Sequence, residues 1–207
     1  MDLELQSKVV LITGGSKGIG LACAKLFTSQ LARVAISSRN QDNLNRAVAA
    51  MPMTFSVATD LTDAKAAAAL VDTVEKQLGP IDILVNCAGA AKRNPPDELS
   101  PLKWREAIEA KFFSYINVSD PMVKRMASRG SGVIVNIIGV GGKIASPVHL
   151  AGGSANAALL LATVGLATAY GPRGVRVVGV NPGLTETDRV VEGFEADAKL
   201  SGKGVAQ

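Results

Sequence analysis

The stretch Thr13-Gly14-Gly15-Ser16-Lys17-Gly18-Ile19-Gly20 decides the fold of this chain. It follows an apolar run at residues 9–12, which predicts a strand, and it leads into a helical pattern over residues 19–31. Glycines permit a tight turn, a close approach of the backbone to a pyrophosphate, and close packing of the helix on the strand. The helix N-terminus offers N–H groups and a positive dipole end to phosphates. We therefore expect a dinucleotide-binding turn, and the alternative is a glycine-rich turn without a ligand.

Apolar runs along the rest of the chain predict the strands of one parallel sheet. They are nearly continuous rather than alternating, as in strands that are buried on both faces. They cover residues 9–12, 34–36, 81–85, 133–138 and 175–180, with a weaker run at 54–58. Helical patterns separate them at residues 19–31, 63–78, 104–129 and 154–170. This alternation predicts an α/β fold, a Rossmann-type doubly wound parallel β-sheet with helices on both faces in three α/β/α layers.

The composition is that of one globular domain with an aliphatic core. The chain has 207 residues, of which 47% are hydrophobic, 19% charged and only 4% aromatic, and single domains mostly run to ~50–250 residues. We expect residues 1–190 to form a dinucleotide-binding Rossmann domain. Residues 191–207 are polar and rich in small side chains, and we expect them to form a mobile tail or a lid fragment.

Charge, histidine and cysteine usage argue against several classes of protein. The net charge is +4, but the basic residues are scattered, which does not favour a nucleic-acid partner. One histidine, His149, and two cysteines form no metal-binding pattern. Cys23 and Cys87 lie in apolar stretches and are expected to be small buried hydrophobes of a reducing cytosol. The first residues resemble no signal peptide, and no uninterrupted apolar run reaches ~18 residues, so we expect a cytoplasmic protein without a membrane partner.

The end of the second predicted strand indicates which nicotinamide cofactor the chain binds. An acidic residue usually stands there to hold the ribose 2′-hydroxyl of NAD. This chain has Ser37, Ser38 and Arg39 instead, and Lys17 lies in the glycine turn. A hydroxyl and two cations suit the 2′-phosphate of NADP. We therefore favour NADP(H) over NAD(H), and the alternative is that Lys17 and Arg39 are ordinary solvated charges.

Four motifs in sequence order resemble the classical type of the short-chain dehydrogenase/reductase family. The glycine turn matches the TGxxxGxG turn of the family, and Asp60-Leu61 match the pair that contacts adenine after the third strand. Asn86-Cys87-Ala88-Gly89 resemble its NNAG motif, with cysteine in the second position, and Asn181-Pro182-Gly183 resemble the segment that holds the nicotinamide end. Together the motifs assign these residues to cofactor binding: Gly14, Ser16, Lys17, Gly18, Ile19, Gly20, Ser38, Arg39, Asp60, Leu61, Asn86, Ala88, Gly89, Asn156, Pro182, Gly183, Thr185 and Thr187.

The catalytic residues of the family are replaced in this chain. The family uses a serine after the fifth strand, a Tyr-x-x-x-Lys at the start of the next helix, and an asparagine in the preceding helix. The serine, tyrosine, lysine and asparagine positions hold Gly139, Gly152, Asn156 and Lys111. In the family the tyrosine exchanges a proton with the substrate oxygen, and general acid–base catalysis of this kind contributes ~10²–10⁴-fold. The usual carbonyl reduction therefore needs another source of the proton, and the sequence leaves the catalytic residues unknown.

Lysine and asparagine have exchanged places between the two helices. In the family these side chains lie close together and are joined through water. We hypothesise that Lys111 and Asn156 keep a similar polar contact, with Asn156 on the ribose of the cofactor. The alternative is a coincidence between a lysine on a helix surface and an asparagine at a helix start.

Several groups are candidates for the missing acid. His149 stands three residues before Gly152, in a loop expected to border the substrate pocket, and histidine titrates in the useful range. Ser146 and Ser154 are near in sequence, although serine is a poor acid without a partner. Tyr115 is one helical turn beyond the lysine and is expected to pack in the core. Ordered water or a substrate group in the space beside the two glycines is an equal alternative.

Two interpretations of function follow. The first is an NADP(H)-dependent oxidoreductase of this family that acts on an unidentified small-molecule carbonyl or alcohol with a different proton donor. The second is an inactive NADP(H)-binding pseudoenzyme that serves as a sensor or structural partner. They differ in whether the space at Gly139 and Gly152 is a lined pocket or is filled by neighbours.

The resemblance also implies a homodimer or homotetramer, and because the chain stops at Gln207 we expect the usual C-terminal substrate-binding part to be missing.

Overall fold

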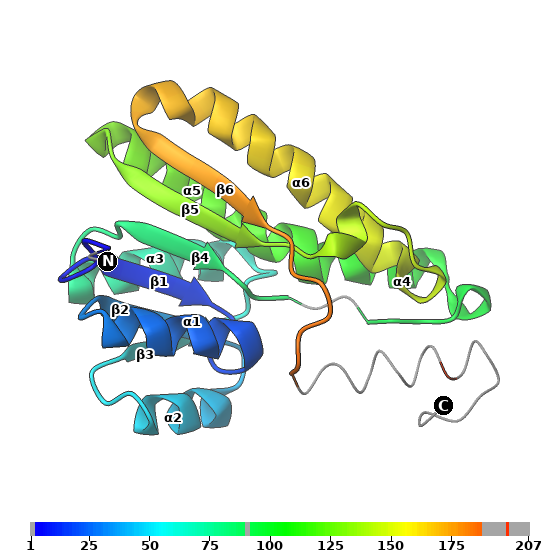
Figure 1. The fold of residues 1–207 in the computed structure, drawn as a ribbon, viewed down its shortest axis with the longest axis horizontal. Helices are drawn as coiled ribbons and strands as arrows, with labels where there is room; N and C mark the ends of the chain where they lie inside the picture. The colour runs from blue at the N-terminus through cyan, green and yellow to red at the C-terminus, as the bar shows by residue number, and fades with distance from the viewer. Residues whose placement is uncertain (1–2, 90–91, 188–197, 199–207) are drawn as a thin grey trace.

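The fold is a six-stranded parallel sheet with the strand order β3-β2-β1-β4-β5-β6 (Figure 1). The structure, a computed structural model, describes residues 3–89, 92–187 and 198. The strands are β1 (Val9–Thr13), β2 (Arg33–Ser38), β3 (Phe55–Ala58), β4 (Ile83–Asn86), β5 (Gly132–Ile137) and β6 (Val175–Val180). All six predicted strands are confirmed. The chain order reverses between β1 and β4, which is where open α/β sheets bind their ligands.

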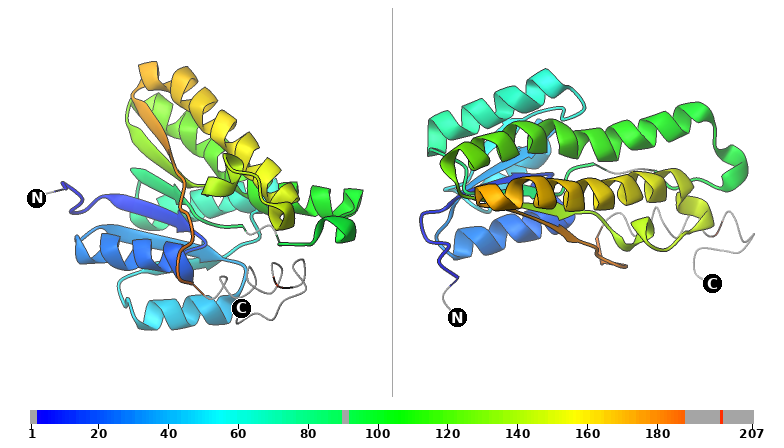
Figure 2. Two further views of the ribbon diagram at one scale, coloured as in Figure 1. Left: turned by 45° about the vertical axis from the view of Figure 1, so that its right-hand side comes forward. Right: turned by 90° about the horizontal axis from the view of Figure 1, so that it is seen from above.

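Helices cover both faces of the sheet. They are α1 (Gly18–Ser29), α2 (Gln41–Ala49), α3 (Ala64–Leu78), α4 (Pro101–Ile108), α5 (Ser114–Arg129) and α6 (Leu150–Tyr170). The α1 and α2 helices pack on one face, whereas α3 and α5 pack on the other. In the view from above, α1 and α3 lie on opposite sides of the sheet (Figure 2). This confirms the predicted doubly wound, three-layer α/β/α fold.

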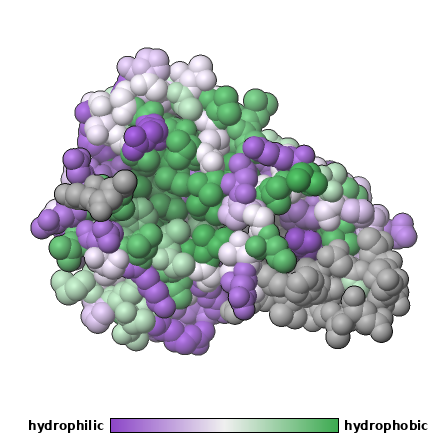
Figure 3. Space-filling view, viewed as in Figure 1, coloured by the Kyte–Doolittle hydropathy of each residue, from purple (hydrophilic) through white to green (hydrophobic). Residues whose placement is uncertain are grey.

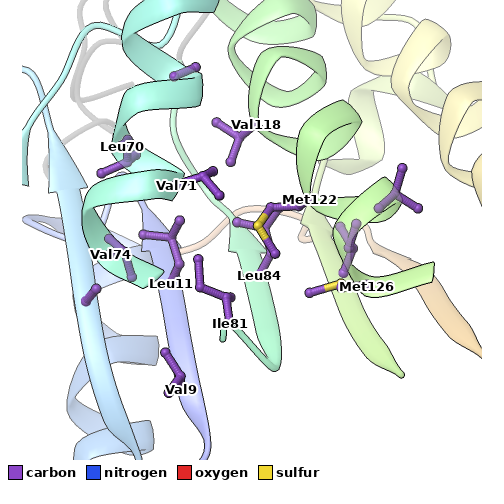
Figure 4. Close-up of a cluster of buried hydrophobic side chains, with 14 of the residues drawn as sticks. Val9, Leu11, Leu70, Val71, Val74, Ile81, Leu84, Val118, Met122 and Met126 are labelled. Carbon is purple, nitrogen blue, oxygen red and sulfur yellow. The ribbon is translucent and has the colours of Figure 1, made fainter. Parts of the chain in front are cut away.

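Two aliphatic clusters fill the space between the sheet and its helices. Val9 and Leu11 of β1 pack in the cluster under α3 and α5, together with Met122 (Figure 4). Val10 and Ile12 of the same strand point the other way and pack with the buried faces of α1 and α2. Because both faces of the central strands are buried, their sequences are continuously apolar.

The helices differ from the prediction in three places, one of which is that α6 begins at Leu150, four residues before the predicted start. The helical pattern at 104–129 is three segments, α4, the π-helical turn η2 (Glu109–Phe113) and α5. A period of 3.6 residues cannot reveal a π turn, because a π turn inserts one extra residue without breaking the helix. The α2 helix was not predicted at all. It is polar and buries only Leu44 and Ala47, so its apolar stripe is too sparse to be recognised.

A chain of buried polar side chains joins the carboxyl ends of the central strands to two helices. Asn86 at the end of β4 donates through Nδ2 to Ser119 on α5 at 2.8 Å and to the Oδ1 atom of Asn136 on β5 at 2.9 Å. Asn136 in turn donates to the hydroxyl of Thr163 on α6 at 2.9 Å. All four side chains are buried, so each bond replaces one that water would otherwise make.

An ion-pair network joins α3 to α5 at the rim of the first cluster. Arg125 contacts Glu75 at 2.7 Å and Asp72 at 2.5 Å, and Arg129 contacts Glu75 at 3.1 Å. Burial alone would raise the pKa of Glu75. Hydrogen bonds from Arg125, the Ile81 N–H group and Arg129 outweigh that effect and lower the pKa of this carboxyl.

Apolar side chains are also exposed on β6 and α6. Green side chains gather over β5 and β6 on the face shown in Figure 3, and Val178 and Val180 of β6 are exposed. Within the described residues, one stretch, Pro147–Arg173, is long and apolar enough to cross a membrane by length and composition, a test that core helices also pass. This stretch contains α6, which packs along β6. The predicted tail, residues 191–207, lies outside the described residues except for residue 198.

Candidate cofactor and active site

Two adjoining pockets lie at the carboxyl ends of the strands. The larger has a volume of about 420 Å³ and the smaller about 180 Å³, and Gly89 lines both. Most of the residues assigned to cofactor binding line one pocket or the other. Of these residues, the smaller pocket is lined by Gly14, Ser38, Arg39, Asp60, Leu61 and Ala88, and the larger pocket is lined by Ile19, Asn156, Pro182, Gly183, Thr185 and Thr187.

The glycine turn between β1 and α1 has the backbone shape that a phosphate cradle needs. Gly14 has φ +67°, and a Cβ atom on it would lie 2.8 Å from the Ala88 backbone. Only glycine fits there, so the turn can lie directly against the segment after β4. The N-cap of α1 is Lys17, whose side chain makes no capping hydrogen bond. The N–H groups of the first helical turn are therefore the donors that a pyrophosphate could accept from.

The smaller pocket brings the end of β2 together with Asp60. Arg39 is exposed at its edge and acts on Asp60 electrostatically. The pKa of Asp60 is lowered, first because it accepts hydrogen bonds from the backbone and hydroxyl of Thr62, and also by the nearby guanidinium. The last residue of β2 is Ser38, so no carboxylate ends this strand.

The larger pocket contains three of the four residues that the sequence comparison placed at catalytic positions. Gly139, Asn156 and Lys111 all line it, beside Pro182 of the segment that resembles the nicotinamide holder. Gly152 is buried in the first turn of α6 and is not among the residues that line it. Gly139 thus lines a pocket, whereas Gly152 is buried.

Gly139 has a backbone conformation that the serine of the family would not readily adopt. Its φ is +121°, and a Cβ atom would lie 3.3 Å from Nδ2 of Asn156. L-residues rarely adopt this region. A serine at this position would therefore need a different backbone after β5, and the neighbouring Asn156 amide occupies the space on that side.

Lys111 and Tyr115 form a buried pair that sequence reasoning missed. The Lys111 Nζ atom donates to the Tyr115 hydroxyl at 2.7 Å and to the carbonyl of Ile137 at 2.9 Å. The Tyr115 hydroxyl also donates to the Ile137 carbonyl. We expected Tyr115 to pack, and it is fully buried, but its hydroxyl holds the lysine that lines the pocket. The spacing of four residues on one helix was the only signal in the sequence.

The other candidate acids divide between the pocket and the surface. His149 and Ser146 line the larger pocket, as predicted for this loop. Ser154 is exposed, and its hydroxyl donates to the Leu150 carbonyl within α6. Both Lys111 and Asn156 line the pocket, but the described hydrogen bonds of Lys111 go to Tyr115 and Ile137. The direct Lys111–Asn156 contact therefore stays a hypothesis.

Two sequence-based assignments need comment. Cys87 was expected to be buried, but it is partly exposed and lines the larger pocket, because β4 ends one residue earlier at Asn86. Asn86 itself is fully buried and bonded to Ser119 and Asn136, so its side chain joins strands and helices. Its assignment to cofactor binding stays a prediction. Within the described residues, no three side chains of the metal-ligating types cluster.

Comparison with known proteins agrees with this geometry. The chain matches the short chain dehydrogenase family over residues 8–198. It is 33% identical over 202 residues to the gluconate 5-dehydrogenase of Gluconobacter oxydans strain 621H, covering 96% of this chain and 78% of that protein. This chain therefore belongs to the short-chain dehydrogenase/reductase family. Its relatives are dehydrogenases and reductases, and it is an oxidoreductase of this type with a nicotinamide dinucleotide cofactor.

Solved structures show the same relationship. Actinorhodin polyketide ketoreductase with NADPH superimposes with a TM-score of 0.92 at 26% identity, covering 97% of this chain and 79% of that chain. An NADPH-bound short chain oxidoreductase from Pseudomonas aeruginosa PAO1, described as containing an atypical catalytic center, gives a TM-score of 0.85 at 31% identity. It covers 93% of this chain and 78% of that chain.

Proposed function

We propose that this chain is an NADP(H)-dependent oxidoreductase that interconverts a small-molecule carbonyl and its alcohol without the serine and tyrosine of the family. The observation that carries the proposal is the pocket of about 420 Å³, which is open at Gly139 and lined by Lys111, Asn156 and His149. A pseudoenzyme with a filled site would have no such space. The pocket is instead lined by groups that can bind and orient a carbonyl or exchange a proton with it.

The residues present fit a bound dinucleotide. The glycine turn and the start of α1 would hold the pyrophosphate, Asp60 and Leu61 the adenine, and Pro182 the nicotinamide end. The bound cofactor supplies the hydride that a carbonyl carbon accepts. The chain itself contributes the remainder of the chemistry, which is to orient the carbonyl and to move a proton at its oxygen.

The preference for NADP(H) rests on the charge at the end of β2. Ser38 and Arg39 line the smaller pocket beside Asp60, and Lys17 occupies the N-cap position of α1 in the glycine turn. A guanidinium and a hydroxyl match the donor needs of a 2′-phosphate. Two of the solved relatives were determined with NADPH, which is consistent with the proposal.

Turnover separates the proposed enzyme from a pseudoenzyme. The purified chain would be mixed with NADPH and a panel of aldehydes, ketones, sugar acids and 3-oxoacyl esters, and the loss of NADPH absorbance would be followed. The proposal predicts carbonyl-dependent oxidation of NADPH for at least one class, with the matching alcohol formed in equal amount. NADPH that binds but is oxidised with none of them would contradict the enzyme and favour the pseudoenzyme.

A further inference from the structure

We propose that Lys111 is the catalytic acid of this enzyme, the group that gives a proton to the substrate oxygen during reduction and takes it back during oxidation. The inference rests on the proposed function, since it requires the cofactor in the larger pocket. Lys111 is 8% exposed, and it lines that pocket together with Gly139, Asn156 and Pro182. A lysine this buried is unusual unless the fold provides partners for it.

The fold provides those partners on one side of the ammonium. The Nζ atom lies 2.7 Å from the Tyr115 hydroxyl and 2.9 Å from the Ile137 carbonyl oxygen, and it stands 4.3 Å from the centre of the Tyr115 ring. All three contacts match a cation: two oxygens accept its N–H groups, and the ring face attracts its charge. The side chain is therefore held in one place at the wall of the pocket.

That place is beside the end of β5. Ile137 is the last residue of this strand, and Gly139, at the serine position of the family, follows two residues later. Gly139 and Lys111 both line the pocket. Because Gly139 has no side chain, it does not block the space between the end of β5 and the pocket. The ammonium thus lies near the region from which the missing serine would have contacted the substrate.

The π turn explains how a lysine reaches this position. Lys111 is the central residue of η2, and Tyr115 lies in the first turn of the α5 helix that follows. A π turn widens the helix locally and is frequently found at functional sites. Lys111 also aligns with the asparagine of the family. The chain therefore has a longer side chain with a transferable proton at this position.

The proton balance of the step is simple. As hydride reaches the carbonyl carbon, the C=O π pair moves onto oxygen. An N–H proton of Lys111 moves to this oxygen and completes the alcohol, leaving a neutral amine that recovers a proton from water. Before transfer, the fixed positive charge also stabilises the negative charge developing on the oxygen.

Among the described residues, three other titratable groups line the same pocket. His149 enters from the short helix η4 (Pro147–His149), Arg93 from the segment after β4, and Cys87 from the end of β4. No carboxylate is among the described residues that line it. His149 is the competing acid, and it packs against Gly141, where a Cβ atom would lie 2.9 Å from its ring.

Substitution kinetics provide the first test. Lys111→Met removes the proton donor, and Lys111→Arg keeps the charge on a group that does not release its proton in proteins. Both should lower kcat roughly 10²–10⁴-fold, with NADPH affinity and KM close to wild type. The alkaline fall in reduction rate should disappear in both variants and persist in His149→Gln. Lys124→Met, which removes an exposed lysine on α5, is the matched control and should behave as wild type.

Three results would overturn the proposal. If Lys111→Arg turns over as fast as wild type, charge without proton transfer is sufficient. If both variants lose NADPH binding, Lys111 holds the cofactor. If the loss of kcat and of the alkaline fall occurs in His149→Gln instead, histidine is the acid.

A second test does not depend on activity. Lysine amines of the wild-type protein would be labelled with acetic anhydride, and the labelled sites quantified by mass spectrometry with and without NADP⁺. Lys111 should be protected by NADP⁺, whereas Lys124 should be labelled equally in both samples. Equal labelling of Lys111 in both samples would show that it does not face the cofactor and would overturn the proposal.

If wild type itself binds no NADP⁺ or reduces no carbonyl, the proposed function fails; if wild type is active and the Lys111 variants match it, only this inference fails.

Discussion

Single residues decide what this site can do, and Gly139 is the clearest example. The family places a serine here, but the φ of +121° and the nearby Asn156 amide leave no relaxed place for one. A return to serine is therefore not a simple repair of the active site. The polar side chains that line the larger pocket come instead from η2, η4 and α6, namely Lys111, His149 and Asn156.

Gly139→Ser should destabilise the protein and should not speed turnover. Strain at a backbone conformation of this kind costs of order 1–3 kcal/mol, which urea unfolding measures directly. Gly171→Ser is the matched control, because Gly171 is exposed, has a φ of −55° and has no atom near its missing Cβ, and this variant should stay close to wild type in stability. A Gly139→Ser protein with wild-type stability and faster turnover would contradict this account of the site.

At the scale of elements, buried polar side chains hold the strand ends in place beneath the pockets. The chain from Asn86 through Asn136 to Thr163 crosses β4, β5 and α6. Ile137 of β5 and Asn156 of α6 line the larger pocket, and Cys87, which also lines it, directly follows β4. Buried polar networks of this kind are costly to break, because a remaining donor loses both its partner and water.

Thr163→Val should lower the free energy of unfolding by about 1–3 kcal/mol, because it leaves an N–H group of buried Asn136 without its acceptor. The two side chains have nearly the same shape, so packing changes little. Thr73→Val on α3 is the control, since the Thr73 hydroxyl is exposed and its described hydrogen bond goes to the Ala69 carbonyl. Equal losses in the two variants, measured by urea unfolding, would show that the network contributes nothing specific.

The α3–α5 ion pairs predict a pH dependence of stability. The pKa of Glu75 is lower in the folded chain than in the unfolded chain. Its contribution is therefore fully present above the unfolded pKa and is lost as the pH falls through the folded pKa. Glu75→Gln should be less stable than wild type at pH 7, and the difference should shrink toward pH 3 in urea titrations. Glu98→Gln, which alters an exposed pair with Lys103, should change little at either pH.

Much of the fold could be predicted because its signals are local. Each of the six apolar runs predicts a strand from a few consecutive residues, and the glycine turn predicts a strand–helix junction in the same way. The N-caps of α3 and α4, Asp63 and Ser100, are also local features. The residues that line the two pockets were also mostly predictable, since motifs mark the carboxyl ends of the strands. The Lys111–Tyr115–Ile137 contact was not predictable, because it depends on a π turn and on tertiary packing that periodicity does not encode.

At the scale of the whole molecule, the exposed apolar residues of α6 favour a second copy as partner. Leu161 is 76% exposed and Val164 is 62% exposed on this helix. We propose that two chains pack across this surface, and Leu161→Lys should then shift the protein toward monomer in light scattering after size exclusion. Leu26→Lys, at another exposed leucine on α1, should leave the assembly unchanged. A wild-type protein that is monomeric at micromolar concentration would contradict the proposal.

The most direct measurement is a calorimetric titration of the purified chain with NADPH and NADH side by side. The account predicts that NADPH binds clearly more tightly, and that Arg39→Ala removes most of this difference while Arg46→Ala, an exposed arginine on α2, does not. Binding of neither cofactor would mean that the glycine turn is only structural. Equal binding of both would contradict the assignment of Ser38 and Arg39 to a 2′-phosphate.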